Sequence, residues 1–218
     1  MKKQKTITMK QLFKRYESIR FVFYNEFTSI LRQPLGLEHY TIGIKCSSDD
    51  EETFIEQVAA SHIGNPNIDD GLVLSGNISK DRLCDMMDVL RDITLHINKT
   101  HLMHPDLKND IWRIAHDKGH CNLMVTCNGG LLSHRRFDED KARSIVIDVP
   151  SILDFDISGI TSSIYNNYGH LIKPFMKLFF ENEGSISDWY NESCENLLKN
   201  VPHTDPHINI RRFAVSSG

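Results

Sequence analysis

Hydrophobic residues recur every three or four positions over much of the chain, which is the spacing of one helix face. The pattern between Thr8 and Arg32 predicts a long amino-terminal helix, residues 8–32, that ends before Pro34. A second pattern begins at Ser79 and continues to Ile97, and it predicts a long central helix. Further helical patterns cover residues 51–63, 106–118, 158–181 and 185–201.

Other stretches alternate apolar and polar residues, which is typical of strands. The clearest are "HYTIGIKC" at 39–46, "NLMVT" at 122–126 and "SIVIDV" at 144–149. Weaker strand patterns occupy 72–74, 131–137 and 208–215. Asn128-Gly129 favours a tight hairpin between 122–126 and 131–137.

Local signals refine the ends of the helices. Ser-Ser-Asp-Asp before residue 51 and Ser187 near the last helix are residues that favour an amino-terminal cap. Gly119 is a plausible end for the helix at 106–118. Gly169 and Pro174 predict an interruption in the helical segment 158–181.

The mixture of helices and strands, with a hairpin in the middle, predicts the α+β class with a mixed, largely antiparallel sheet. A long amino-terminal helix, a long central helix and a carboxyl-terminal helical region complete this expectation. A length of 218 residues fits a single domain, residues 1–218, in which the helix at 8–32 could form an appendage.

Composition narrows the classes of partner and compartment. The net charge of −4 provides no overall basic field for a nucleic-acid backbone, so a nucleic-acid partner is unsupported although it is not excluded. No apolar run reaches the ~18–20 residues of a membrane-spanning helix, which predicts a cytoplasmic protein without a membrane partner. Five cysteines spread along a chain of this size are expected to be reduced and mostly buried.

Chemistry-bearing residues are concentrated in "AHDKGHCNLMVTCNGGLLSHRRFD", residues 115–138. His116-Asp117 at the end of a predicted helix resembles the central motif of the HD-domain metal phosphohydrolases over about five residues. The resemblance implies that both residues bind a divalent metal that activates water. His116, Asp117 and His120 are then the candidate catalytic residues, and His96, His101, His104 or Asp148 could complete the site.

Two other centres can be drawn from the same segment. Zinc could be bound by residues chosen from His116, His120, Cys121, Cys127 and His134. A Cys–His hydrolase could use Cys121 or Cys127 with His134 and with Asp138 or Asp148. Neither spacing is a specific motif, so the cysteines are better interpreted as small buried hydrophobic residues.

Two arginine pairs are candidate partner-binding residues, Arg135, Arg136, Arg211 and Arg212. Arginines in a strand bind phosphate well, but they also protect an exposed strand edge from aggregation. The glycines of "CNGGLL" lack the Lys-Ser/Thr of a phosphate-binding P-loop, so a turn is the better interpretation.

The sequence therefore favours a non-catalytic cytosolic protein without a cofactor that binds another protein subunit, as an accessory, adaptor or immunity-type factor. Aromatic residues in the first helix and in Phe175–Phe180 could anchor the partner. The alternatives are a metal-dependent phosphohydrolase or nuclease centred on His116 and Asp117, and an accessory protein that contacts nucleic acid.

Overall fold

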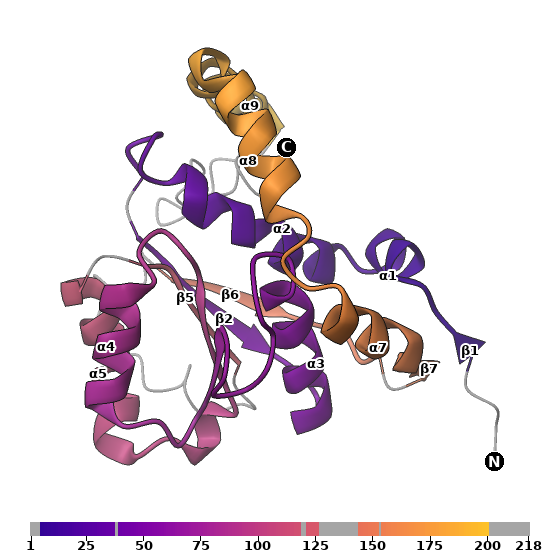
Figure 1. Ribbon diagram of the computed structural model, residues 1–218, viewed down its shortest axis with the longest axis vertical. Helices are drawn as coiled ribbons and strands as arrows, with labels where there is room; N and C mark the ends of the chain where they lie inside the picture. The colour runs from indigo at the N-terminus through magenta and orange to yellow at the C-terminus, as the bar shows by residue number, and fades with distance from the viewer. Residues whose placement is uncertain (1–4, 38, 119–120, 127–143, 153, 201–218) are drawn as a thin grey trace.

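The computed structural model describes residues 5–37, 39–118, 121–126, 144–152 and 154–200, and Figure 1 shows a central sheet with helices on both faces. The helices and strands follow one another as β1 (Lys5–Thr6), α1 (Met9–Arg15), α2 (Glu17–Leu31), β2 (Thr41–Lys45), α3 (Asp49–Ala60), β3 (Val73–Ser75), α4 (Lys80–Val89), β4 (Leu95–Asn98), η1 (Thr100–Leu102), α5 (Pro105–Lys118), β5 (Leu123–Thr126), β6 (Ser144–Asp148), β7 (Phe155–Asp156), α7 (Ser158–Asn166), α8 (Ile172–Glu181) and α9 (Glu183–Asn200).

The main sheet has five strands in the order β3-β4-β5-β2-β6, and every pair is parallel. The prediction of an α+β fold with a largely antiparallel sheet is therefore wrong, and the protein is an α/β protein. In the register of the sheet, Ile42 of β2 lies opposite Met124 of β5 and Ile145 of β6. β1 and β7 form a separate parallel pair.

The predicted central helix at 79–97 is also wrong, because this segment contains a helix and a strand. α4 begins after Ser79, whose side chain accepts a hydrogen bond from the backbone of Arg82, and it ends at Val89. Asp92 has a positive φ of 60°, a value that interrupts a right-handed helix. Ile97, the last member of the apparent helical stripe, lies in β4.

Each face of the sheet is covered by its own group of helices, as Figure 1 shows with α4 and α5 on one side and α3 on the other. Leu95 and Ile97 of β4 pack with α4 and α5 in one hydrophobic cluster. Ile42 and Ile44 of β2 pack with α1, α2, α3 and α7 in the other cluster. Burial of both faces is the usual condition of a parallel sheet.

The predicted amino-terminal helix is divided in two at Tyr16, which has an extended backbone conformation. α1 begins with a capping box formed by Thr8 and Gln11. Leu12 and Ile19 are buried in the cluster that also contains β2, so α1 and α2 cover the sheet. The prediction that residues 8–32 could form an appendage to a single domain stays a prediction.

The predicted interruption of 158–181 is confirmed, since α7 ends at Asn166 and Gly169 has a φ of 71°. The last helix begins at Glu183, so the prediction of Ser187 as its cap is wrong. The predicted strands at 131–137 and 208–215 lie outside the described residues. In the part of the chain that the structure describes, none of the helices combines the length and the apolar composition that a bilayer crossing requires.

Gly76, directly after β3, packs against the backbone that follows β4. A Cβ atom at Gly76 would lie 2.1 Å from the carbonyl oxygen of Lys99, which no side-chain movement can relieve. Lys99 itself has a φ of 54° and turns the chain into η1. The two loops at this end of the sheet therefore depend on the absence of a side chain at Gly76.

We expect Gly76→Ala to lower the free energy of unfolding by about 2 kcal/mol or more, because backbone must move to accept the methyl group. Denaturant unfolding measures this change. Gly159→Ala in α7 is the matched control, since a Cβ there meets nothing within 4 Å and alanine favours a helix. Equal effects of the two substitutions would contradict the assigned role of Gly76.

Candidate functional site

Open parallel sheets bind ligands at the carboxyl ends of their strands, where successive connections leave towards opposite faces. Here α3, which follows β2, covers one face, whereas α4 and α5 cover the other. The predicted ligand position is therefore the carboxyl edge near β2, β4 and β5.

The turn between β2 and α3 is where such folds commonly hold phosphate, with a glycine-rich loop before a helix amino terminus. In this chain the turn is Cys46-Ser47-Ser48, without glycine or lysine. Ser48 caps α3 by accepting a hydrogen bond from the backbone of Glu51 at 3.3 Å. The first helical turn then carries four acidic residues, Asp49, Asp50, Glu51 and Glu52. These carboxylates offset the helix dipole and repel a phosphate.

A group of buried polar side chains continues inward between α3 and the sheet. We call it the carboxylate seam and define it as Glu26, Glu52, Glu56, His96, Asn98 and Thr126, whose relative exposures are 0 to 1 %. Glu52 and Glu56 are four positions apart on α3 and therefore lie on one face of the helix. Asn98 and Thr126 end β4 and β5.

Some members of the seam are hydrogen-bonded. Oε1 of Glu56 accepts a hydrogen bond of 3.1 Å from the backbone N–H of Thr126. The side-chain amide of Asn98 donates to Oγ1 of Thr53 at 2.9 Å. Nε2 of His96 lies 3.2 Å from Oε2 of Glu26. These contacts connect α2, α3, β4 and β5 through the interior of the protein.

Other oxygens of the seam make no close, well-aligned hydrogen bond among the described residues. They are both carboxylate oxygens of Glu52, one carboxylate oxygen each of Glu26 and Glu56, the amide oxygen of Asn98 and the hydroxyl of Thr126. A buried polar atom without a partner costs about 1–3 kcal/mol, and more when it is charged. Protons, water or a bound cation can satisfy such oxygens.

Burial changes the acidity of the two helix carboxyls. Desolvation raises the pKa of Glu56 well above its ordinary value of 4.5, and the neighbouring Glu52 raises it further, while the hydrogen bonds from Thr126 act in the opposite direction. Desolvation and the charge of Asp49 raise the pKa of Glu52 to about 7, although Lys99 and Thr126 lower it. Both carboxyls therefore keep their protons to a higher pH than an exposed glutamate would.

The outer end of the seam reaches solvent at Asp49 and His101. Nε2 of His101 lies 3.6 Å from Oδ2 of Asp49, and Nζ of Lys99 lies 4.0 Å from the same oxygen. One ligand atom each from Asp49, Glu52 and His101 lies within 4.8 Å of the others. This combination of two carboxylates and an imidazole can bind a divalent metal.

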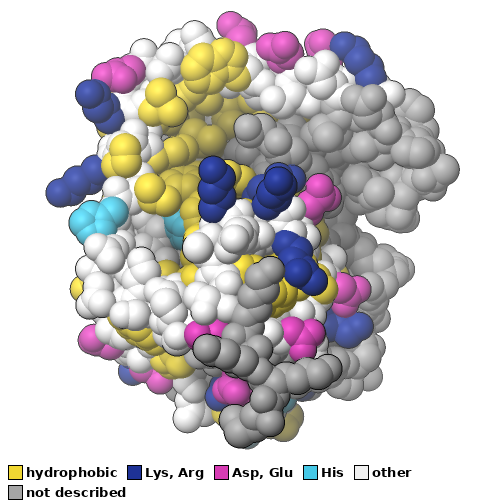
Figure 2. All heavy atoms as spheres, turned by 90° about the vertical axis from the view of Figure 1, so that its right-hand side faces the viewer, with side chains coloured by type: hydrophobic (Ala, Val, Ile, Leu, Met, Phe, Trp, Pro, Cys, Tyr) yellow, Lys and Arg dark blue, Asp and Glu magenta, His cyan; other side chains and the backbone are white. Residues whose placement is uncertain are grey.

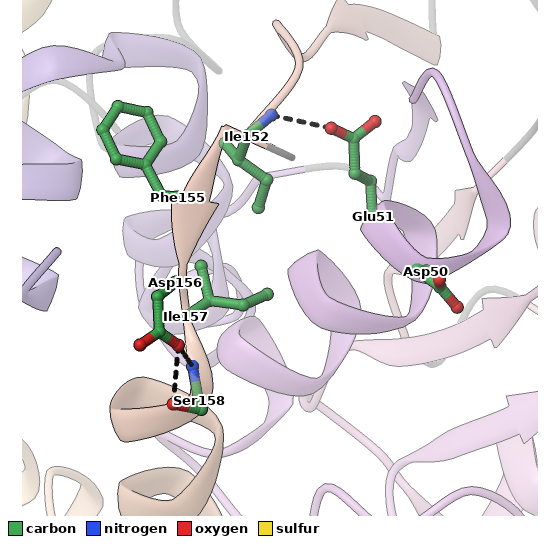
Figure 3. A pocket seen from close by; sticks show the side chains of 7 residues that line it. All are labelled: Asp50, Glu51, Ile152, Phe155, Asp156, Ile157 and Ser158. Carbon is green, nitrogen blue, oxygen red and sulfur yellow. Dashed lines mark hydrogen bonds between the residues drawn. The ribbon is translucent and has the colours of Figure 1, made fainter. Parts of the chain in front are cut away.

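Glu51 points away from the seam and fastens α3 to the segment after β6. Figure 3 shows its carboxylate accepting from the backbone N–H of Ile152, and the same oxygen accepts from Oγ of Ser151, both at 2.7 Å. Burial favours the neutral acid, but these bonds and those from Ser47 outweigh it and lower the pKa of Glu51. A pocket of about 310 Å³ beside Glu51 is lined by Asp50, Glu51, Ile152, Phe155, Asp156, Ile157 and Ser158.

Most of the predicted centre at 115–138 lies outside the described residues, so it stays a prediction. His116 and Asp117 lie in the last turn of α5, on the face of the sheet opposite α3, and Asp117 is exposed. Cys121 is buried in the cluster with α4 and α5, and burial raises the pKa of its thiol to about 12, so it is not a ready thiolate. The side chain of His116 and residues His120, Cys127, His134, Asp138, Arg135, Arg136, Arg211 and Arg212 lie outside the described part of the structure.

The remaining residues considered for that centre are dispersed. His96 belongs to the seam, and His101 lies at its outer end. His104 is exposed and lies 3.6 Å from Asp106, while Asp148 ends β6 and pairs with Lys45 at 3.2 Å. The sequence interpretation missed Glu52 and Glu56, although both fall on the same helical stripe as Ile55 and Ala59, which is the signal that could have revealed them.

Comparisons with known proteins identify the fold. No protein-family model matches the chain, and no curated protein matches its sequence. A solved structure described as the SCCmec type IV Cch active helicase is similar, with a TM-score of 0.74 and 16% sequence identity. The similarity covers 97% of this chain and 46% of that chain, so this protein spans less than half of the helicase. At this identity the similarity establishes a shared fold.

The seam generates a prediction about pH. Because the pKa of Glu56 is raised in the folded state, the folded protein retains a proton that the unfolded chain releases above about pH 4.5, and stability falls as the pH rises. We expect Glu56→Gln to match the wild type near pH 4.5 and to become more stable than it by about 1.4 kcal/mol per pH unit above that value, until the folded carboxyl ionises. Urea unfolding in metal-free buffer from pH 4 to 8 measures the difference.

Glu51→Gln is the control, since the pKa of Glu51 is shifted in the opposite direction. Its removal should destabilise the protein at neutral pH, and the loss should fade as the pH falls through the lowered pKa and the carboxylate gains a proton. A pH-independent effect of Glu56→Gln would show that its carboxyl carries no extra proton.

Proposed function

We propose that this chain is a non-catalytic α/β domain that binds a protein partner through its carboxyl-terminal helices and does not bind a nucleoside triphosphate. The observation that carries the proposal is the concentration of exposed apolar side chains on residues 165–189. Of the eleven large hydrophobic residues exposed in the described part of the chain, six fall in this stretch, namely Tyr165, Tyr168, Leu171, Leu178, Phe180 and Trp189.

α8 and α9, which we call the helical arm, project from the body of the protein in Figure 1. The arm contacts α2 through the tilted rings of Phe27 and Phe175, whose centroids are 4.5 Å apart. Phe180 and Trp189 are 64% and 50% exposed. Figure 2 shows hydrophobic side chains gathered over the upper part of the face, the level at which the arm lies.

Exposed aromatic residues on a projecting element suit a protein partner. Aromatic side chains supply much of the binding free energy of protein interfaces, and large apolar patches are uncommon on monomers. The basic candidates Arg135, Arg136, Arg211 and Arg212 lie outside the described residues, so they support neither a nucleic-acid nor a protein partner. We therefore retain a protein subunit as the proposed partner.

Electrostatics supports the second half of the proposal. A triphosphate at the carboxyl edge would face the four acidic residues of the first turn of α3 instead of a glycine-rich loop with a lysine. Removing phosphate and carboxylate charges from water and bringing them together is unfavourable. The acidic turn therefore argues against nucleotide binding by this chain, although a helicase shares its fold.

We expect no saturable binding of Mg²⁺-ATP at concentrations up to about the millimolar range in which physiological ligands bind enzymes. Isothermal titration calorimetry of the full chain checks binding, and phosphate release checks hydrolysis. Stoichiometric ATP binding would contradict this half of the proposal and leave the partner-binding half to be tested separately.

For the partner, we expect Phe180→Gln and Trp189→Gln each to weaken association at least about tenfold, as loss of an aromatic anchor does. A protein that co-purifies with the wild-type chain from native cells would be produced separately, and its dissociation constant measured by calorimetry against each variant. Circular dichroism confirms that the variants remain folded.

Val89→Gln is the matched control, because Val89 is 76% exposed at the end of α4 and lies outside the arm. Its affinity should stay within about twofold of the wild type, as expected for a residue outside the contact. The proposal fails if purified wild-type protein and partner do not bind, or if the arm variants bind as well as Val89→Gln.

A further inference from the structure

We propose that Asp49, Glu52 and His101 bind a zinc ion at the outer end of the carboxylate seam. This site is distinct from the metal centre that the sequence suggested at His116 and Asp117. It does not depend on the protein-binding function proposed for the helical arm, so either proposal can fail without the other.

The three side chains come from two elements that the fold brings together. Asp49 and Glu52 lie in the first turn of α3, three positions apart and therefore on neighbouring parts of one face. His101 lies in η1, immediately after the left-handed Lys99 turns the chain at the end of β4. The parallel arrangement places the amino end of α3 beside the carboxyl end of β4.

The distances suit a metal ion. Zinc binds nitrogen and oxygen ligands at about 2.0–2.2 Å, which places two tetrahedral ligands about 3.4 Å apart. Nε2 of His101 and Oδ2 of Asp49 are already 3.6 Å apart. All three ligand atoms lie within 4.8 Å of one another, so a small rotation of the two outer side chains closes the set.

Glu52 distinguishes this group from an ordinary surface cluster of charges. It is 0% exposed, and its carboxylate makes no close, well-aligned hydrogen bond among the described residues, although Thr126 and the backbone of Lys99 lie near enough to lower its pKa. A buried carboxylate without partners is strongly unfavourable, and coordination of a cation satisfies it. Because Glu52 is held inside the seam while Asp49 and His101 are partly exposed, the site has one fixed ligand and two adaptable ligands.

The donor set favours zinc over magnesium. Imidazole is a common ligand of zinc, whereas magnesium prefers an all-oxygen octahedral shell. Two carboxylates balance the charge of a divalent ion, and three protein ligands leave a fourth position for water. Lys99 is the competing cation, but its ammonium is 4.0 Å from Asp49 and partly exposed, so it can move into solvent.

The test uses the full chain, stripped of metal with a chelator and titrated with Zn²⁺ alone by calorimetry in a weakly coordinating buffer. We expect one saturable site and a Zn²⁺-dependent rise in the unfolding temperature. Glu52→Gln keeps the shape of the side chain and should weaken Zn²⁺ binding at least about tenfold. His101→Ala, at a partly exposed position, should weaken it by a similar factor.

His104→Ala is the matched control. His104 and Asp106 are separated by the same 3.6 Å as His101 and Asp49, but they are exposed and lack a buried glutamate. Zn²⁺ affinity should stay within about twofold in this variant, because nothing fixes a third ligand there. The proposal fails if the wild type does not bind Zn²⁺, or if Glu52→Gln and His101→Ala both bind it as tightly as the wild type. It also fails if His104→Ala loses as much affinity as these two variants. Equal binding of Mg²⁺ would overturn the choice of metal.

Discussion

The burial of Glu52 and Glu56 between α3 and the sheet is the constraint on which the rest of the structure depends. A helix that carries two carboxyls towards the interior can pack only if the opposing strands offer polar groups at the same height. Asn98 and Thr126 do so, at the last positions of β4 and β5. The polar ends of β4 and β5 and the position of α3 are thereby matched to each other.

The polar interior extends through α2 as well. Asn25 is bonded to the hydroxyl of Tyr40, and Ser29 contacts Thr94 at 2.6 Å and accepts from Asn122 at 2.8 Å. Tyr40, Thr94 and Asn122 directly precede β2, β4 and β5, at the end of the sheet opposite the acidic turn. Directional bonds at both ends locate the helices on one face, whereas the other face, under α4 and α5, is held by apolar packing.

Much of the local structure could be predicted from the sequence, because alternation and helical periodicity are local signals. β2, β5, β6, α3 and α5 follow from such patterns, and Ser48 marks the start of α3. The sequence pattern joined α4 and β4 into one predicted helix. This removed the alternation of strand and helix that indicates a parallel sheet, so the direction of the strands could not be predicted. Ile97 happens to continue the helical spacing of Leu83, Met87 and Leu90 across the break at Asp92.

The carboxylate seam could not be predicted, for a related reason. Attention to histidine and cysteine led to residues 115–138, a centre that stays a prediction, whereas the seam is formed by residues of α2, α3, β4 and β5. Glutamates on an apolar stripe carry a weaker signal, since Glu is common on helices and its burial depends on the tertiary fold. The contribution of Asn98, His101 and Thr126 depends on strand order, which a single sequence does not specify.

The place of β2 in the middle of the sheet has a consequence for synthesis of the chain. β2 is made first among the five strands, yet it pairs only with β5 and β6, which are made last. Its pairing with β6 joins Thr41 to Ser144, about a hundred residues later, and contacts so distant in sequence form slowly. During translation β3 and β4 can pair while Ile42 and Ile44 still have no partner strand. The nascent protein therefore leaves β2 without a neighbour until β5 is made and with one open edge until β6 follows, and this interval carries its greatest risk of aggregation.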